Sequence, residues 1–309
     1  MKTMMVLALA LFSLHSHAID KARILDVFGV SNLVDGPSGM SVTPVTYPSY
    51  QEMEAKLGRM VQRHTARAQM ISYGRTVNGL SLNVIRIALP QRGRGERPAV
   101  QISGVIHGNE YLGIEDRLPE HFLDNTTRMP GLTAFLEKGG IIYVIPVINP
   151  DGFTRKRRLN QNGADLNRDF DLLPRNDARF TQPETRALAD FLERDLTASG
   201  AKLRLSLDYH CCLPAMIIPW SYIDAQPEQK DQSSFHTLGG IGRSVLGFPY
   251  GNAMETVNYL AEGSSIDYFY AKYGTLSLAI EGSWRGEEGN LAKHVDFWDK
   301  LFQSLADQR

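Results

Sequence analysis

Two histidines and one glutamate have the residue types and spacing of a zinc site. His107 and Glu110 form a His-x-x-Glu pair, and His210 is a third candidate further along the chain. Catalytic zinc is commonly held by three such side chains and keeps one position for water, which supports hydrolysis. The pair alone does not decide between a metal site and two polar residues satisfied within the protein.

Two further carboxylates accompany this candidate metal site. Glu281 ends an apolar run, and a carboxylate buried there needs a partner. It is either a salt-bridged side chain or a general base beside a metal-activated water. Asp208 lies two residues before His210 and therefore on the same face of a strand. It either orients the histidine ring or has a surface role.

These residues must be positioned by an alternation of strands and helices. The predicted strands are 99–106, 140–148, 203–208 and 275–280, and the predicted helices are 50–68, 108–125, 182–199, 264–272 and 294–307. A hairpin is predicted within residues 70–89, where Gly and Asn interrupt two short strands. The pattern predicts a single α/β domain with a mixed, largely parallel central sheet flanked by helices.

The candidate residues follow the ends of these predicted strands. His107 follows the first strand, residues 149–152 (Asn-Pro-Asp-Gly) follow the second, His210 follows the third and Glu281 ends the fourth. In open α/β sheets, ligands bind outside the carboxyl ends of the strands. We therefore expect these side chains to meet at one edge of the sheet.

The start of the chain has the layout of a secretory signal peptide. A positive residue precedes the apolar stretch 4–14, and a small-x-small cleavage site ends at Ala18. We predict a signal peptide at 1–18, an irregular lead-in at 19–46 and a catalytic domain at 47–309. The mature protein is expected to be secreted or periplasmic.

Composition restricts the possible partners. The formal net charge is -1, so nothing marks a nucleic-acid binder. No stretch after the N-terminus is apolar over about 18 residues, so we expect no membrane span after signal removal. We expect the protein to act as a monomer.

The two cysteines are neighbours, Cys211 and Cys212. Disulfide geometry normally places the two Cα atoms about 4.4–6.8 Å apart, whereas neighbours across a trans peptide lie about 3.8 Å apart. We favour two small buried residues over a bond between the neighbours, which an oxidising compartment would permit.

Taken together, the residues resemble the zinc metallocarboxypeptidase family (M14) typified by carboxypeptidase A, over about residues 47–284. With the predicted signal peptide in front of such a catalytic domain, we expect a bacterial secreted member. The motifs that carry the resemblance are His107-x-x-Glu110, Asn149-Pro-Asp-Gly152, Arg158-Leu-Asn160 with Gly163-Ala-Asp-Leu-Asn-Arg168, His210, Tyr259-x-x-x-Gly263-x-Ser265-Ile266-Asp267, and Glu281.

The resemblance implies one Zn²⁺ ion, held by His107, Glu110 and His210. Glu281 is then the catalytic base. Arg158 is implied to polarise the scissile carbonyl, although it lies in a basic run that could be a surface patch.

The same resemblance implies the residues that bind substrate. Asn167 and Arg168 would hold the terminal carboxylate of the peptide, which an exopeptidase has to recognise. A solvated loop is the alternative for this pair, and rim packing is the alternative for Tyr259, which would close over the substrate. Ile266 falls at the specificity position, where an apolar residue disfavours selection of Lys or Arg.

The implied activity is hydrolysis of a C-terminal peptide bond on a substrate with a free carboxylate. Cell-wall stem peptides are one expected substrate. General peptide scavenging and deacylation of N-acyl amino acids are the alternatives. Two positions depart from the family pattern: Asp169 stands where Asn is usual, and Cys211-Cys212 replaces small polar residues.

Overall fold

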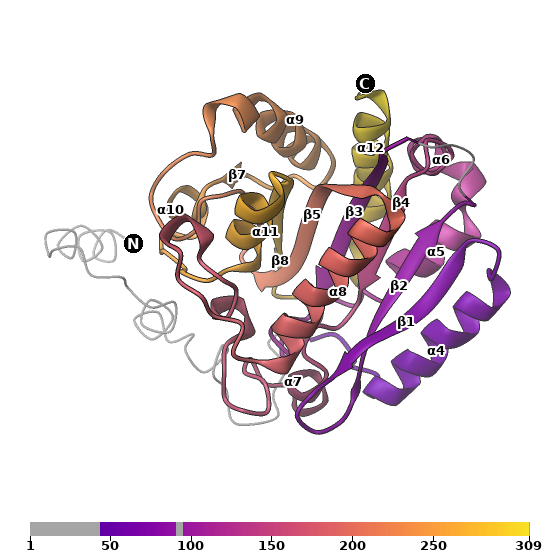
Figure 1. The fold of residues 1–309 in the computed structure, drawn as a ribbon, viewed down its shortest axis with the longest axis horizontal. Helices are drawn as coiled ribbons and strands as arrows, with labels where there is room; N and C mark the ends of the chain where they lie inside the picture. Colours follow the sequence, from indigo (N-terminus) through magenta and orange to yellow (C-terminus); the bar gives the residue numbers. More distant parts are fainter. Residues whose placement is uncertain (1–43, 91–94, 309) are drawn as a thin grey trace, which may run out of the picture.

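The computed structural model describes residues 44–90 and 95–308, and Figure 1 shows how they are arranged. The predicted signal peptide at 1–18, and the predicted lead-in as far as residue 43, lie outside the described residues. Within the described part of the chain, no helix is both long and apolar enough to cross a bilayer.

An eight-stranded sheet forms the centre of the molecule, in the order β1-β2-β4-β3-β5-β8-β6-β7. Its strands are β1 (Ala68–Arg75), β2 (Ser81–Ala88), β3 (Arg97–Gly104), β4 (Ile141–Ile145), β5 (Ala201–Cys212), β6 (Ala215–Ile217), β7 (Tyr250–Gly251) and β8 (Leu276–Ser283). The central pairs β4–β3, β3–β5 and β5–β8 are parallel, and β1–β2, β2–β4 and β6–β8 are antiparallel. The predicted mixed, largely parallel sheet is confirmed.

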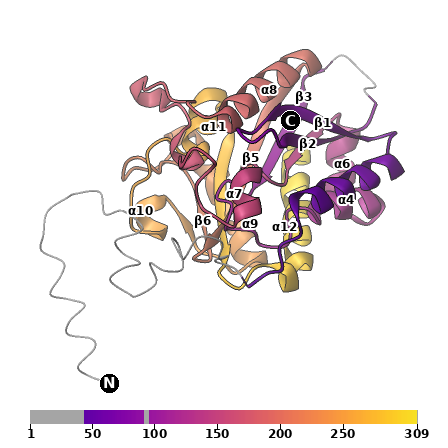
Figure 2. The same ribbon diagram turned by 90° about the horizontal axis from the view of Figure 1, so that it is seen from below.

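Helices cover both faces of this sheet. They are α4 (Tyr50–Arg63), α5 (Leu118–Asp124), α6 (Pro130–Glu137), α7 (Pro150–Arg155), α8 (Pro183–Ser199), α9 (Gln229–Val245), α10 (Ala253–Thr256), α11 (Ser265–Tyr273) and α12 (Leu291–Asp307). Helices α8 and α11 contact one face, while α4, α5, α6, α9 and α12 belong to the other layer. Figure 2 shows the sheet between the two layers.

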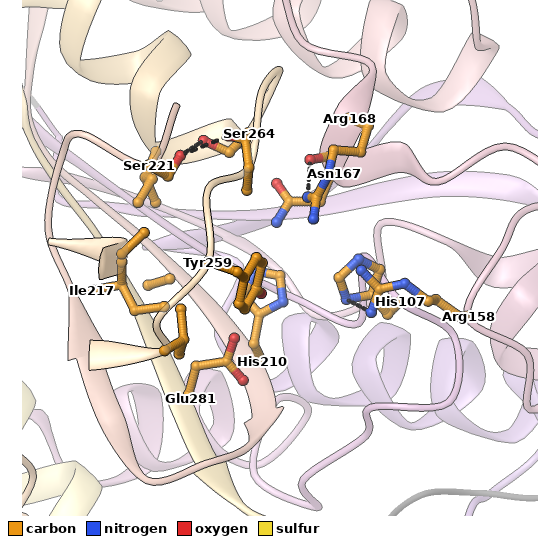
Figure 3. Close-up of a pocket in the computed structure, with 15 residues that line it drawn as sticks. His107, Arg158, Asn167, Arg168, His210, Ile217, Ser221, Tyr259, Ser264 and Glu281 are labelled. Carbon is orange, nitrogen blue, oxygen red and sulfur yellow. Dashed lines mark hydrogen bonds between the residues drawn. The ribbon is translucent and has the colours of Figure 1, made fainter. Parts of the chain in front are cut away.

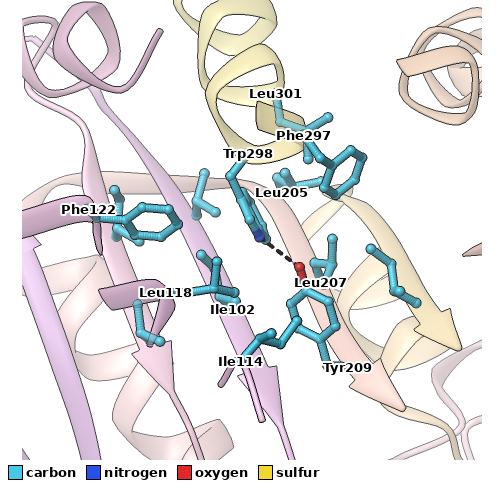
Figure 4. Packing of buried hydrophobic residues seen from close by; sticks show 14 of the residues in the cluster. Ile102, Ile114, Leu118, Phe122, Leu205, Leu207, Tyr209, Phe297, Trp298 and Leu301 are labelled. Atoms are coloured by element: carbon cyan, nitrogen blue, oxygen red, sulfur yellow. Dashed lines mark hydrogen bonds between the residues drawn. The ribbon is translucent and has the colours of Figure 1, made fainter. Parts of the chain in front are cut away.

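Burial on both faces explains the apolar character of the central strands. All five residues of β4 (Ile-Ile-Tyr-Val-Ile) are buried, as expected of a parallel strand covered on both sides. On the α12 side, the buried Trp298 donates its indole N–H to the Tyr209 hydroxyl at 3.0 Å (Figure 4). This contact ties α12 to β5, the strand that carries His210.

Local signals set the ends of the helices. Ser49 and Glu52 form a reciprocal capping box at the start of α4. Helix α8 ends at Ser199 and is capped by Gly200, whose φ of 59° lies in the left-handed region that glycine adopts without a steric penalty.

The predicted helix over 108–125 was wrong in its first half, because α5 begins only at Leu118. A Cβ on Gly108 would lie 2.0 Å from the carbonyl carbon of Gly152, and Gly113 has a φ of +81°. This stretch therefore crosses the sheet edge as an irregular loop. Helices α6, α7, α9 and α10 and the short strands β6 and β7 were not predicted from the sequence.

The structure also corrects the expectation for the two cysteines. Cys211 and Cys212 form a disulfide across a cis peptide bond, with the Cα atoms 3.1 Å apart. The expected Cα separation of about 3.8 Å applies to a trans peptide, whereas this peptide is cis.

Candidate active site

The three predicted metal ligands meet at the carboxyl edge of the sheet. His107 lies just beyond β3, Glu110 follows in the same loop and His210 lies on β5. One ligand atom from each lies within 4.8 Å of the others. The Nδ1 atom of His107 is 3.0 Å from Glu110 Oε2, and Nδ1 of His210 is 3.4 Å from the same oxygen.

Each histidine directs its other ring nitrogen at an aspartate. His107 Nε2 lies 3.0 Å from Asp165 Oδ1, and His210 Nε2 lies 3.2 Å from Asp208 Oδ2. A carboxylate at Nε2 favours the tautomer with the proton on that nitrogen. It leaves the Nδ1 lone pairs facing the Glu110 carboxylate, which is the arrangement a metal ion requires.

Asp165 also organises Arg158. Its Oδ2 accepts from Nε and Nη2 of Arg158 at 3.1 and 2.8 Å, while Nη1 of Arg158 donates to Glu110 Oε1 at 3.1 Å. Burial acts to raise the pKa of Asp165, but Arg158 and His107 outweigh it and hold that pKa well below the ordinary value. Asp165 is therefore an anion that bridges the arginine and the histidine.

The Asn-Pro-Asp-Gly segment, residues 149–152, stabilises the loops that carry this cluster. The Asn149 side chain caps α7 by accepting from Gly152 N at 2.8 Å. Its Nδ2 donates to the carbonyl oxygens of Ile106 and Arg158, at 3.2 and 3.3 Å. The motif thereby joins the loop that carries His107 to the loop that carries Arg158.

A pocket opens beside the metal-ligand cluster (Figure 3). The predicted site residues that line it are His107, Arg158, Asn167, Arg168, His210, Tyr259, Ile266 and Glu281. The ninth predicted residue, Glu110, is in the metal-ligand cluster itself. The structure thus brings all nine predicted residues to one place, from segments as distant in sequence as β3 and β8.

Asn167 and Arg168 form one polar side of the pocket. The Asn167 carbonyl oxygen Oδ1 accepts from Ser265 N at 2.9 Å, which fixes the orientation of its amide. Nη1 of Arg168 donates to the Asn167 main-chain oxygen at 2.8 Å. In Figure 3 both side chains face the same space as Tyr259, a geometry suited to an anion.

Asp169, where the family pattern has Asn, does not join this polar side. Its carboxylate accepts from the main-chain N–H groups of Thr181 and Gln182, each at 2.9 Å, and from the hydroxyl of Thr185. These donors surround the start of α8, so Asp169 secures that helix.

The far end of the pocket is apolar. A small buried cluster there consists of Ile217, Ala253, Ile266 and Ala279, with Val257 packed against it. The next residue after Ile266, the buried Asp267, accepts from Ser221 N at 2.9 Å and from the Ser221 hydroxyl at 2.6 Å. Burial raises the pKa of Asp267 to about 6 despite these donors.

Comparison with known proteins agrees with this geometry. The profile of the zinc carboxypeptidase family (M14) matches residues 53–298. The chain belongs to this family. Relatives include carboxypeptidase SOL1 of Arabidopsis thaliana, 34% identical over 161 residues, and human carboxypeptidase A6, 25% identical over 275 residues. These matches cover 50% and 76% of the chain, and the chain spans 32% and 60% of the two relatives.

Two solved structures share the fold of this chain. Thrombin-activatable fibrinolysis inhibitor superimposes with a TM-score of 0.71 at 19% identity, covering 85% of this chain and 75% of the other. A metallocarboxypeptidase from Burkholderia cenocepacia gives a TM-score of 0.63 at 17% identity, covering 84% of this chain and 68% of the other. At such identities the likeness concerns the fold alone.

The ligand cluster fits the single zinc ion of this zinc carboxypeptidase family. Zinc bonds of about 2.1 Å in a tetrahedral arrangement separate neighbouring ligand atoms by about 3.4 Å. The observed separations of 3.0 and 3.4 Å from Glu110 Oε2 are close to that spacing, and all three ligand atoms lie within 4.8 Å of one another. Two imidazoles and one carboxylate are also the donors that zinc accepts at catalytic sites.

Two residues of this site were not predicted from the sequence. Asp165 was noted only within a motif, yet it contacts both His107 and Arg158. Ser221, which lines the pocket and binds Asp267, gave no signal in the sequence. For Asp165, its place two residues before Asn167 was the available clue.

Proposed function

We propose that this chain is a zinc-dependent carboxypeptidase that removes the last residue of a peptide with a free C-terminal carboxylate. The observation that carries the proposal is the shared pocket. In it, the Arg168 guanidinium and the Asn167 amide lie beside a cluster suited to zinc and the Glu281 carboxylate. An anion-binding group next to a hydrolytic centre is what an exopeptidase requires.

In this proposal, His107, Glu110 and His210 hold the ion. When bound, zinc makes water acidic enough to lose a proton near neutral pH and polarises the scissile carbonyl. The Glu281 carboxylate accepts the proton of the attacking water and then delivers it to the nitrogen of the leaving amine.

Arg158 is assigned to the oxygen of the scissile carbonyl. Its guanidinium is fixed in place by Asp165 and Glu110 before any substrate arrives. A preorganised cation stabilises negative charge that develops on this oxygen without the cost of reorganising at the moment of reaction.

The C-terminal residue of the substrate is bound by Asn167, Arg168 and Tyr259. Arg168 pairs with the terminal carboxylate through two parallel hydrogen bonds, and the Tyr259 ring covers it. The terminal side chain then enters the apolar end of the pocket at Ile266, which favours an uncharged residue.

The test is incubation of purified protein with ordinary peptides, followed by mass spectrometry. We expect loss of one C-terminal residue. A zinc chelator and Glu281→Gln should each abolish this loss, and a peptide ending in an amide should survive, because it lacks the carboxylate. Activity that persists in both the chelated protein and Glu281→Gln would contradict the proposal.

A more specific proposal concerns the natural substrate and the location of the enzyme. We propose a secreted or periplasmic enzyme with a signal peptide at 1–18, a lead-in at 19–46 and a catalytic domain at 47–309, which acts on peptidoglycan stem peptides. Tri-, tetra- and pentapeptide muropeptides belong in the same assay. Preference for ordinary peptides would favour peptide scavenging instead.

Deacylation of N-acyl amino acids is the alternative chemistry. Such a compound presents the same carboxylate next to an amide bond, so Arg168 could bind it equally well. Hydrolysis of an N-acyl amino acid with peptides left intact would replace the carboxypeptidase proposal by this alternative.

A further inference from the structure

Outside the pocket, an ion pair between Arg179 and Glu262 joins two segments. One carries Asn167 and Arg168 (the carboxylate-binding segment), and the other carries Tyr259 (the tyrosine segment). We propose, on the basis of the proposed function, that Arg179 and Glu262 are positioning residues, which hold these two segments against each other. The spacing between these two segments then sets how well a terminal carboxylate is bound.

Arg179 contacts the carboxylate-binding segment directly. Its Nη1 donates to the main-chain oxygen of Arg168 at 2.9 Å. Its Nε and Nη2 donate to Asp177 Oδ2 at 3.1 and 2.8 Å, which fixes the plane of the guanidinium. Arg168 lines the pocket, so a shift of Arg179 would move the main chain of a pocket residue.

The same guanidinium reaches the tyrosine segment. Nη2 of Arg179 lies 3.3 Å from Glu262 Oε2, and Nη1 lies 3.5 Å from the Glu262 main-chain oxygen. The other carboxylate oxygen of Glu262 pairs with Arg175. Tyr259 precedes Glu262 by only three residues, so the ion pair restrains the segment close to the ring.

Backbone contacts show that the two segments lie against each other at this point. Phe170 N donates to Gly263 O at 3.1 Å. A Cβ on Gly263 would lie 2.6 Å from Arg168 O and 2.7 Å from Arg179 Nη1, and Gly263 has a φ of +73°. The close approach of the two segments therefore requires glycine at position 263. The Arg179–Glu262 ion pair stabilises this contact on its solvent-exposed side.

The tyrosine segment is also held at its other side, where Ala261 N donates to Ser221 O at 2.7 Å. Loss of the ion pair should therefore loosen the segment without releasing it. The planar guanidinium of Arg179 donates to Asp177, Arg168 and Glu262 at the same time. A lysine ammonium cannot reproduce this geometry. Both Glu262→Gln and Arg179→Lys should consequently weaken the link.

The first measurement is steady-state kinetics on a peptide with a free carboxylate. In Arg179→Lys we expect KM to rise about two- to fivefold, the effect of weakening one surface ion pair, with kcat nearly unchanged. Glu262→Gln also loses the pair with Arg175, so its KM should rise at least as much. The matched control is Glu96→Gln. Glu96 is similarly exposed, 53% against 47% for Glu262, and pairs with Arg204 on another part of the surface. It should leave KM unchanged.

The second measurement does not depend on activity. Hydrogen exchange at the Phe170 amide reports separation of the two segments and should become about two- to fivefold faster in both variants, but not in Glu96→Gln. Zinc content and far-UV circular dichroism should match the parent. Unchanged exchange and unchanged KM would overturn the proposal. If the parent lacks carboxypeptidase activity, the proposed function fails by that result, and the exchange data alone decide whether the link holds the segments together.

Discussion

Replacing Asp208 by asparagine should weaken zinc binding while leaving the fold in place. The Asp208 carboxylate is buried, with Oδ1 accepting from the Ser103 hydroxyl at 2.8 Å. Its Oδ2 accepts from the Ser265 hydroxyl at 3.0 Å and faces His210 Nε2 at 3.2 Å. Asn has the same shape, but it is neutral and has only one accepting oxygen.

In either orientation, the new amide at position 208 should make His210 a weaker zinc ligand. If the NH₂ group faces His210, it favours the tautomer with the proton on Nδ1, the nitrogen that the ion needs. If the oxygen faces His210, a neutral acceptor replaces an anion and the ring becomes less basic. Loss of such a partner typically costs 10- to 100-fold in metal affinity, or about 1.4–2.8 kcal/mol.

The assay is competition for zinc with a chelator of known affinity, monitored by a change in the chelator's absorbance. Asp267→Asn is the matched control, because Asp267 is an equally buried carboxylate in the same region that binds Ser221. Its zinc affinity should equal that of the parent. A folded Asp208→Asn protein with parental zinc affinity would refute the assignment of Asp208 as the partner that orients His210.

Three other changes test separate parts of the site and fold. Arg168→Lys keeps the charge but loses the paired donors, so KM for a free-carboxylate peptide should rise about tenfold or more, with a smaller change in kcat. Ile266→Asp places an anion at the apolar end of the pocket and should shift relative kcat/KM toward peptides ending in Lys or Arg, measured in a mixed-peptide competition. Burial raises the pKa of Glu115 from 4.5 to about 8, although Leu112 N–H opposes the shift. The folded state therefore keeps a proton that the unfolded chain loses, and the free energy of unfolding should fall as pH rises from about 4.5 to 8. Urea denaturation across this range should show the decline in the parent and a flatter profile in Glu115→Gln.

Alternation along a strand explains why one aspartate could be predicted and another could not. Asp208 and His210 are two apart on β5, so the period of two placed them on the same face before any coordinates were known. Asp165 lies 58 residues from His107 in an irregular loop. No periodicity relates these two residues, and only the tertiary arrangement brings them together.

The errors in secondary structure have equally specific causes. The apolar residues after Gly108 resemble a helix, but Gly108 packs against the backbone of Gly152 and Gly113 takes a left-handed conformation. Strand β6 has only three residues, too few to show an alternating pattern. It pairs with β8 beside Glu281, so a non-local contact decides its conformation.

The register of β5 and β8 gives the site its geometry. These strands are parallel, and His210 pairs with Glu281 across the ladder. In a parallel ladder, residues in register point to the same face, so the proposed metal ligand and the proposed base lie side by side because of strand pairing. A shift of one residue in either strand would turn one of the two side chains to the opposite face of the sheet. The apolar residues before them, Leu207 and Leu278, are fully buried and pair in the same ladder, so the core that stabilises the sheet also fixes the register on which the proposed chemistry depends.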